Sequence, residues 1–555
     1  RLETIIDGLQ DHGRLARNTA VLATAKHFLG DGGTRYGSST TGTYTTDQGV
    51  TYATQQELEA IHLSPYRTAV DKGVGSVMPS YSSLQILGRD AQPIKMHARG
   101  DQITGVLKGR LGFRGFVISD WNGIDQITAD HRTNAKLGVN AGIDMVMVPD
   151  QYVTFEKDLK NLVTAGDVTM ARIDDAVSRI LLQKFKLGLF EQPYADRTNI
   201  GSIGNAAHRA VARTLAAESQ VLLKNTGNVL PLAANANVYV AGSNANNIGN
   251  QVGGWTVTWQ GSSSSPAVGT TILAGLQQVA PGATFTYSAN ASAPIGNATV
   301  GVVVVGETPY AEGAGDVGNG HTLDLSAADK AAVDTVCAAV KCIVLVVSGR
   351  PMNIAPIQAE ASAIIASWLP GSEGAGVADV LVGNAPFTGR LPVSWAKNVD
   401  TTTSPVNVGD ASYDPLYAYG WGLRTDSPKA RLTAARDALA AGADGAAGKR
   451  AVPTLTALLQ GDFWNSDGTL HRVIPAFALL SQAAKNLGGV SVGAAMQAGA
   501  IVSLVRDVAQ KAIVNAGASG MAKTASLTAD AEHALLLGNP TTAIALLDRA
   551  YRQVI

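Results

Sequence analysis

The first 192 residues repeat one pattern: a short apolar run, then polar or aromatic residues, then a segment with helical periodicity. The runs are rich in strand-forming side chains and cover residues 21–28, 74–81, 116–121 and 143–149. The helical patterns cover residues 54–72, 100–110, 132–141 and 170–185. This alternation is typical of a parallel sheet or barrel. Four units are half of a (β/α)8 barrel, which normally needs about 250 residues. The sequence therefore predicts a partial barrel over residues 1–192.

The bulk composition excludes several classes of protein. A chain of 555 residues is long enough for two to four domains, each with its own core. Only 16% of the residues are charged and the formal net charge is −1, so no basic excess exists to attract nucleic acid. Apolar runs such as 343–347 are far too short to span a bilayer. The start at Arg1 is interpreted as a processed or truncated end.

Two further regions follow a linker predicted at residues 193–204. Residues 205–424 contain buried strand patterns and intervening helical segments, which predict an open α/β sandwich domain. Its strands are expected at residues 238–241, 300–305, 343–347 and 363–366. A nucleotide-binding domain is disfavoured, because neither a well-placed GxGxxG nor a Walker A sequence is present. Residues 425–450 are predicted to be a second linker, and residues 451–555 a helical domain. In its last helix Ile544, Leu547, Tyr551 and Val554 form one stripe.

Chemically active side chains collect where the four predicted strands end. Each alone has a structural explanation; Asp120, for example, is equally suited to cap the next turn. Together they lie at the carboxyl edge of one sheet, where active sites of α/β folds are found. Cationic, hydroxyl, carboxylate and aromatic groups suit a sugar ring and its hydroxyl groups. The residues are Lys26, His27, Tyr81, Asp120, Trp121 and Met147.

The second region adds two loops and a pair of cysteines. Residues 253–261 hold Trp255 and Trp259 in a glycine-framed turn; we expect Trp255 to be a core anchor and Trp259 to be free to bind. Residues 306–316 form an acidic, glycine-rich loop after a predicted strand. Cys337 and Cys342 are separated by four residues, a spacing that suits either a disulfide closed by a turn or a pair of free thiols.

These segments resemble successive motifs of glycoside hydrolase family 3. The motifs are AKHFLGDGGT at 25–34, VMPSYSS at 77–83, KMHA at 95–98, GFVISDWNG at 115–123 and GIDMVMVP at 142–149. Further matches at 348–351, 368–374, 387–392 and 419–423 extend the resemblance to about residue 423. The pattern is most similar to the branch of exo-acting β-glucosidases and exo-1,3/1,4-β-glucanases. By this resemblance, residues 1–192 correspond to the C-terminal half of the (β/α)8 barrel.

The resemblance implies a role for each candidate residue. Asp120 matches the nucleophile, and Glu312 matches the acid/base in preference to Glu307, which is expected to hold the loop. Lys26, His27, Tyr81 and Met147 are implied to line the site of the terminal sugar, and Trp121 and Trp259 to clamp the next one. Cys337 and Cys342 fall where plant-like members carry a small disulfide. That match favours an exported protein, secreted or periplasmic.

The implied activity is retaining, exo-acting hydrolysis of β-D-glucosides, without a metal or organic cofactor. Two departures support an alternative, an inactive or incomplete member that only binds sugar. Gln126 stands where members of this branch often have arginine, and the family's first barrel strands, which supply an aspartate and an arginine to the sugar, have no counterpart. Asp47 is a candidate for one further acidic contact. Xylosidase and N-acetylglucosaminidase activities also stay open.

Overall fold

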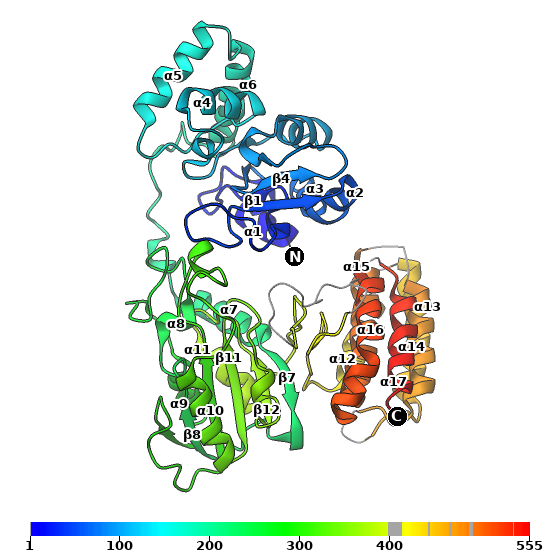
Figure 1. Ribbon diagram of the computed structural model, residues 1–555. Coiled ribbons are helices and arrows are strands. Elements are labelled where there is room, and N and C mark those ends of the chain that lie inside the picture. The colour runs from blue at the N-terminus through cyan, green and yellow to red at the C-terminus, as the bar shows by residue number, and fades with distance from the viewer. Residues whose placement is uncertain (1, 398–412, 442–444, 466–468, 488–491, 537) are drawn as a thin grey trace. The chain divides into compact units, whose positions relative to one another are not determined.

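The computed structural model describes residues 2–397, 413–441, 445–465, 469–487, 492–536 and 538–555, and the chain forms two compact units (Figure 1). The first unit holds residues 1–203 and 312–322, and the second holds residues 204–311 and 323–555. The break after Ile203 lies inside the segment 193–204 that the sequence predicts as a linker. The loop that carries Glu312 is part of the first unit, although the chain on both sides of it belongs to the second.

A parallel three-stranded sheet lies at the centre of the first unit, with the order β1-β3-β6. The strands are β1 (Thr24–Phe28), β3 (Ser76–Pro79) and β6 (Phe116–Val117). They confirm three of the predicted strands, each shorter than the apolar run that contains it. The fourth prediction is wrong, because residues 143–149 form no strand; they run beside the end of β6 through a bridge between Ile118 and Met145 and through N–H bonds from Asp144 and Met145 to the Val117 carbonyl. The reason is local: the carboxylate of Asp144 accepts the Val117 N–H at 2.8 Å, where a strand would offer a carbonyl.

A second small sheet, which the sequence analysis did not predict, has the order β2-β4-β5. Its strands are β2 (Val50–Ala53), β4 (Ser83–Ile86) and β5 (Ile94–Lys95). The helices of this unit are α1 (Leu2–Leu9), α2 (Gln55–Glu57), α3 (Ser64–Asp71), α4 (His131–Ala141), α5 (Tyr152–Thr164) and α6 (Met170–Lys186). The predicted helix at 54–72 is divided among α2, the helical segment Leu58–His62 and α3, whereas α5 was not predicted.

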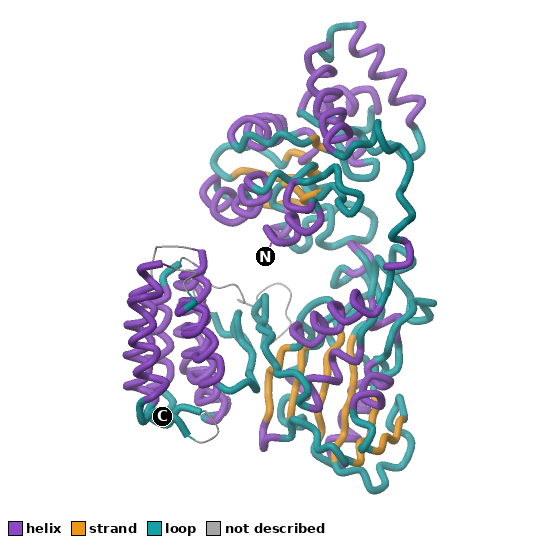
Figure 2. The backbone as a smooth tube through the Cα atoms, turned by 180° about the vertical axis from the view of Figure 1, so that it is seen from behind, coloured by secondary structure: helices purple, strands orange, loops and turns teal. Residues whose placement is uncertain are grey.

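The second unit contains a six-stranded sheet with the order β7-β12-β11-β10-β8-β9, in which only the β12–β7 pair is antiparallel. Its strands lie side by side with helices around them (Figure 2). The strands are β7 (Val221–Asn225), β8 (Asn237–Ala241), β9 (Thr284–Tyr287), β10 (Val300–Gly306), β11 (Cys342–Val347) and β12 (Ala363–Ala366). The helices are α7 (Ala206–Ser219), α8 (Ile248–Val252), α9 (Ile272–Val279), α10 (Ala327–Ala339) and α11 (Gly374–Val382). All four strands predicted in this region are present.

Continuous apolar runs make the inner strands of this sheet, because both of its faces are covered. In β10, Val302 and Val304 join one buried cluster with α9 and α11, whereas Val303 and Val305 join another with α10. This is the two-residue period of an extended chain. A disulfide links Cys337, in α10, to Cys342 at the start of β11, with the two Cα atoms 5.0 Å apart. The sequence left that pairing open, and the structure confirms the disulfide.

The C-terminal part of the chain is helical, as predicted. Its helices are α12 (Pro428–Ala440), α13 (Gly445–Gln460), α14 (Val473–Leu487), α15 (Val492–Asn515), α16 (Gly517–Leu536) and α17 (Pro540–Arg552), which share one apolar core (Figure 1). In the predicted stripe Ile544 and Leu547 are buried and Tyr551 packs against them. The segment 425–450, predicted as a linker, contains α12 and the start of α13; residues 442–444 lie outside the described part. No helix among the described residues is long and apolar enough to cross a membrane.

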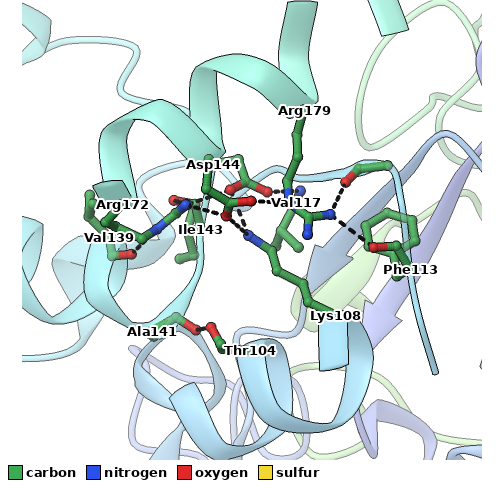
Figure 3. A network of polar contacts seen from close by, with 12 residues as sticks. Thr104, Lys108, Phe113, Val117, Val139, Ala141, Ile143, Asp144, Arg172 and Arg179 are labelled. Atoms are coloured by element: carbon green, nitrogen blue, oxygen red, sulfur yellow. Dashed lines mark hydrogen bonds and ion pairs between the residues drawn. The ribbon is translucent and has the colours of Figure 1, made fainter. Parts of the chain in front are cut away.

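A buried polar network supports β6 (Figure 3). The carboxylate of Asp144 is fully buried; it accepts the Lys108 ammonium at 2.6 Å and also pairs with Arg172. Arg179 donates to the carbonyl oxygens of Phe113 and Gly115, each at 2.9 Å. Helix α6, which carries both arginines, is therefore bound to the strand that ends just before Asp120.

Replacing Asp144 with alanine should lower the free energy of unfolding by about 3 kcal/mol, because Lys108 and Arg172 would lose their buried anion and keep only the more exposed carboxylate of Asp175. Urea denaturation of the full chain measures this change. Asp167→Ala is the control, since it removes a solvent-exposed carboxylate paired with Lys136 and should cost far less. Equal losses in the two variants would show that the Asp144 network does not hold β6.

Candidate active site

Asp120 follows β6 in a segment held by the backbone and by two buried side chains. Its N–H donates to Nε2 of His97 at 3.1 Å, and the Trp121 N–H donates to its Oδ1 at 2.7 Å. Burial lowers the pKa of His97 to about 4, so the imidazole is neutral and can accept this bond. The preceding Ser119 Oγ accepts the N–H of Met147 at 2.7 Å. The carboxylate of Asp120 is thus fixed in place and 15% exposed.

His27 lies between two carboxylates. Its Nε2 is 3.4 Å from Oδ2 of Asp120, and its Nδ1 is 3.4 Å from Oδ2 of Asp31. Asp31 also accepts the Ser80 hydroxyl. Burial disfavours a charged imidazole, but the hydrogen bonds to the two carboxylates outweigh burial and raise the pKa of His27 to about 9. Burial would also raise the pKa of Asp120; the contact with His27 and the Trp121 N–H instead bring it below its ordinary value.

The other residues predicted on this rim surround Asp120. The Tyr81 hydroxyl donates to the carbonyl oxygen of Trp121, and burial raises the pKa of this phenol. The Trp121 side chain is 58% exposed, so its face is available to a ligand. Lys26, next to His27 on β1, is exposed. The Met147 carbonyl accepts the Asn122 N–H at 3.1 Å, which places Met147 beside the Asp120 segment.

Glu312 lies in the first unit, on the loop 312–322, with an exposed side chain and a left-handed backbone (φ 53°). Left-handed conformations are uncommon outside glycine and recur at functional sites. Partial burial, and then the charges of Asp47 and Asp120, raise the pKa of Glu312 above its ordinary value, whereas Lys26 and His27 oppose that rise. Because these charges act on it, Glu312 lies within electrostatic reach of both Asp120 and His27.

Glu307 has a different environment, in the second unit. Nε and Nη2 of Arg350 both donate to its Oε1, at 2.9 and 2.8 Å, and the Tyr310 hydroxyl donates to Oε2 at 3.0 Å. A carboxylate whose two oxygens are both hydrogen-bonded is suited to fix the connection between β10 and the loop that follows it.

The second unit also carries Trp255 and Trp259, with their ring centroids 6.4 Å apart. Trp259 is 48% exposed; the expectation that Trp255 is a core anchor is wrong, because it is 67% exposed.

Four contributors to the site were missed or only partly recognised. Asp31 contacts His27, and His97 accepts the N–H of Asp120, as described above. Lys95 donates to the carbonyl of Tyr81 at 2.9 Å and to Oε1 of Gln126 at 3.0 Å. Gln126, flagged as a departure, donates in turn to Gln48 at 2.9 Å. Asp31, Lys95 and His97 lie inside the motifs at 25–34 and 95–98, but the sequence analysis assigned them no role. In the described part of the chain, no three or more His, Cys, Asp or Glu side chains gather closely enough to hold a metal ion.

Two family models match the chain. The model of the glycosyl hydrolase family 3 N terminal domain matches residues 2–182, and that of the family 3 C-terminal domain matches residues 220–425. An exo-1,3/1,4-β-glucanase (a Q683A mutant) from a Pseudoalteromonas species is 35% identical, with a TM-score of 0.68 over 76% of this chain and 68% of that one. The chain belongs to glycoside hydrolase family 3.

Curated relatives agree with this membership of family 3. The lysosomal beta glucosidase of Dictyostelium discoideum is 31% identical over 73% of this chain, and the beta-xylosidase of Formosa agariphila is 30% identical over 75%. The chain spans 51% and 61% of the lengths of these two proteins. The family's two domain types are therefore both present here, a barrel-like N-terminal domain and an α/β sandwich.

The position of His27 predicts a change in pH dependence. His27→Gln removes the cation beside Asp120, so the pKa of Asp120 should rise and the acidic limb of kcat/KM should move to higher pH. The profile on an aryl β-glucoside measures this. His131→Gln, which removes a His–Asp contact 2.9 Å long elsewhere in the unit, should leave the acidic limb in place. An unchanged acidic limb in His27→Gln would show that the charge of His27 does not lower the pKa of Asp120.

Proposed function

We propose that this chain is a retaining, exo-acting β-D-glucoside hydrolase that releases glucose from the non-reducing ends of β-glucosides or β-glucan oligosaccharides. The observation that carries the proposal is a pair of carboxyl groups whose surroundings move their pKa values in opposite directions. Asp120 is kept ionised beside a protonated His27, while Glu312 is kept protonated to higher pH. Such a pair provides the nucleophile and the acid that glycoside hydrolysis with retention requires.

In the first step, Asp120 attacks the anomeric carbon while Glu312 gives its proton to the departing glycosidic oxygen. An ester between Asp120 and the sugar forms as the bond to the leaving group breaks. In the second step, Glu312, now ionised, removes a proton from water, the water oxygen attacks the same carbon, and the carboxylate of Asp120 leaves. Two inversions give a product with the β configuration of the substrate.

The remaining side chains are assigned to sugar binding. Lys26 and His27 donate to hydroxyl groups of the terminal sugar, with Tyr81 and Met147 lining the same subsite. The exposed face of Trp121 suits stacking against the next sugar ring. Stacking depends on the face of the ring and not on the glycosidic bond, so it tolerates several linkages. Trp259, in the second unit, offers another exposed indole, which suits stacking against a sugar ring.

Similarity supports glucosides as the substrate class, because the exo-1,3/1,4-β-glucanase is 35% identical and the Dictyostelium relative is a beta glucosidase. The beta-xylosidase at 30% identity makes aryl β-xylosides the first comparison substrate. We also assign the protein to an oxidising, exported location. The disulfide supports this assignment, as does a 28% identical relative from Salmonella typhimurium named periplasmic beta-glucosidase.

Two variants test the catalytic pair. Asp120→Ala should reduce hydrolysis of aryl β-glucosides by about 10⁴-fold or more, since it removes the carboxylate assigned to form the ester. Glu312→Gln should lower kcat/KM, which reports the first step, by about 10²–10⁴-fold on substrates with poor leaving groups and spare it on activated ones. On activated substrates breakdown of the ester should limit kcat, and azide should raise that kcat, because it attacks the ester without needing a base. Steady-state kinetics over a series of aryl leaving groups measures both effects.

Glu307→Gln is the matched control, because it changes the neighbouring acidic residue of the loop, which is bound to Arg350. Its loss should be similar on every substrate and should not respond to azide. Selective loss in Glu307→Gln, with uniform loss in Glu312→Gln, would exchange the two assignments. Glucose binding without any turnover in the unmodified chain would identify a sugar-binding protein instead.

A further inference from the structure

The loop that carries Glu312 is fastened to the first unit by a second carboxylate. Asp316 lies four residues after Glu312, and its Oδ2 accepts three successive backbone N–H groups. These belong to Thr45, Thr46 and Asp47, at 3.0, 2.7 and 2.9 Å. Consecutive N–H groups that converge in this way form a concave site for an anion. Three amide donors on one carboxylate oxygen bind Asp316 firmly to residues 45–47.

Further contacts join the same two segments. The Thr45 hydroxyl donates to the carbonyl oxygen of Val317 at 2.7 Å, and the Gly313 N–H donates to Oδ2 of Asp47 at 2.9 Å. A Cβ at Gly313 would lie 2.3 Å from a ring carbon of Tyr44, so only glycine allows this approach. The residue directly after Glu312 is therefore packed against the residue directly before the anion site.

The connection between Glu312 and Asp316 is short and stiff. Residues Glu312–Gly315 form one helical turn, and the Asp316 N–H closes it by donating to the Gly313 carbonyl at 3.1 Å. Asn319 donates to that same carbonyl at 2.9 Å. A turn closed in this way transmits the position of Asp316 to the backbone of Glu312. The position of the Glu312 carboxylate therefore depends on the contacts that hold Asp316.

We infer that Asp316 is a positioning residue: its carboxylate, held by the amides of residues 45–47, fixes the loop so that Glu312 can give and take the proton in catalysis. The inference rests on the proposed function, in which Glu312 is the acid/base. It also assigns a role to residues 36–48, a loop that precedes β2 and whose last residues provide the anion site.

The test compares Asp316→Ala with the unmodified 555-residue chain on aryl β-glucosides of graded leaving-group ability. A misplaced Glu312 should lower kcat/KM by about 10²-fold on substrates with poor leaving groups and leave it nearly unchanged on the most activated ones. On the most activated substrates, where breakdown of the ester limits kcat, azide should raise kcat. Amide hydrogen exchange at residues 45–47 should become about 10-fold faster or more, since three bonds to a charged group are lost.

Two further variants separate positioning from folding. Asp316→Asn keeps an oxygen that can accept the same N–H groups and should recover much of the activity on poor leaving groups. Asp130→Ala is the matched control, because Asp130 caps α4 in the same unit by accepting the Thr133 N–H at 2.8 Å. Its effect should be on stability alone, with equal rates relative to the unmodified chain on every leaving group.

The inference is overturned if Asp316→Ala loses activity equally on all leaving groups, as a general defect would, or if the amides of residues 45–47 stay protected. Glu312→Gln in the same series identifies the cause. If Glu312→Gln is selective and Asp316→Ala is not, the positioning role fails and the proposed function stands. If Glu312→Gln is itself unselective, the acid/base assignment fails, and the positioning role fails with it.

Discussion

The charge on His27 is the interaction on which the rest of the site depends. An imidazole with carboxylates 3.4 Å from each ring nitrogen is stable as a cation, and its pKa of about 9 keeps it charged at neutral pH. That cation offsets the cost of burying Asp120 and keeps it ionised. Without it, burial would favour the protonated acid, which cannot attack a sugar carbon. Asp31 therefore stabilises the charge on His27, although it is 44% exposed and belongs to a turn.

The surroundings of Glu312 have the opposite effect to those of Asp120, because they raise its pKa above the ordinary value. Partial burial, and then the charges of Asp47 and Asp120, raise the pKa of Glu312, so Glu312 keeps its proton at a pH where Asp120 is ionised. Repulsion among these carboxylates would favour an open loop unless something held it. The amides of residues 45–47 supply that hold, because they bind Asp316 without adding a positive charge that would lower the pKa of Glu312. Neutral donors keep the loop in place and leave the acid protonated.

The sequence predicted those elements whose formation depends on neighbouring residues. The strands β8, β10, β11 and β12 follow from apolar runs, and Asp120 was found because it follows such a run. The strand expected at 143–149 failed because one side chain, Asp144, replaced a backbone partner. The roles of Asp31, His97 and Asp316 could not be predicted from spacing. Asp316, for example, contacts an amide 270 positions away, and only the folded chain brings them together.

The most direct test of this account is to trap the glycosyl ester. A 2-deoxy-2-fluoro-β-glucoside with an activated leaving group slows the second step more than the first, so the ester accumulates. Mass spectrometry of proteolytic peptides then locates the added sugar. The account predicts one label per chain, on Asp120. A label on Asp31, Glu312 or any other carboxylate, or turnover of ordinary glucosides with no label formed, would contradict it.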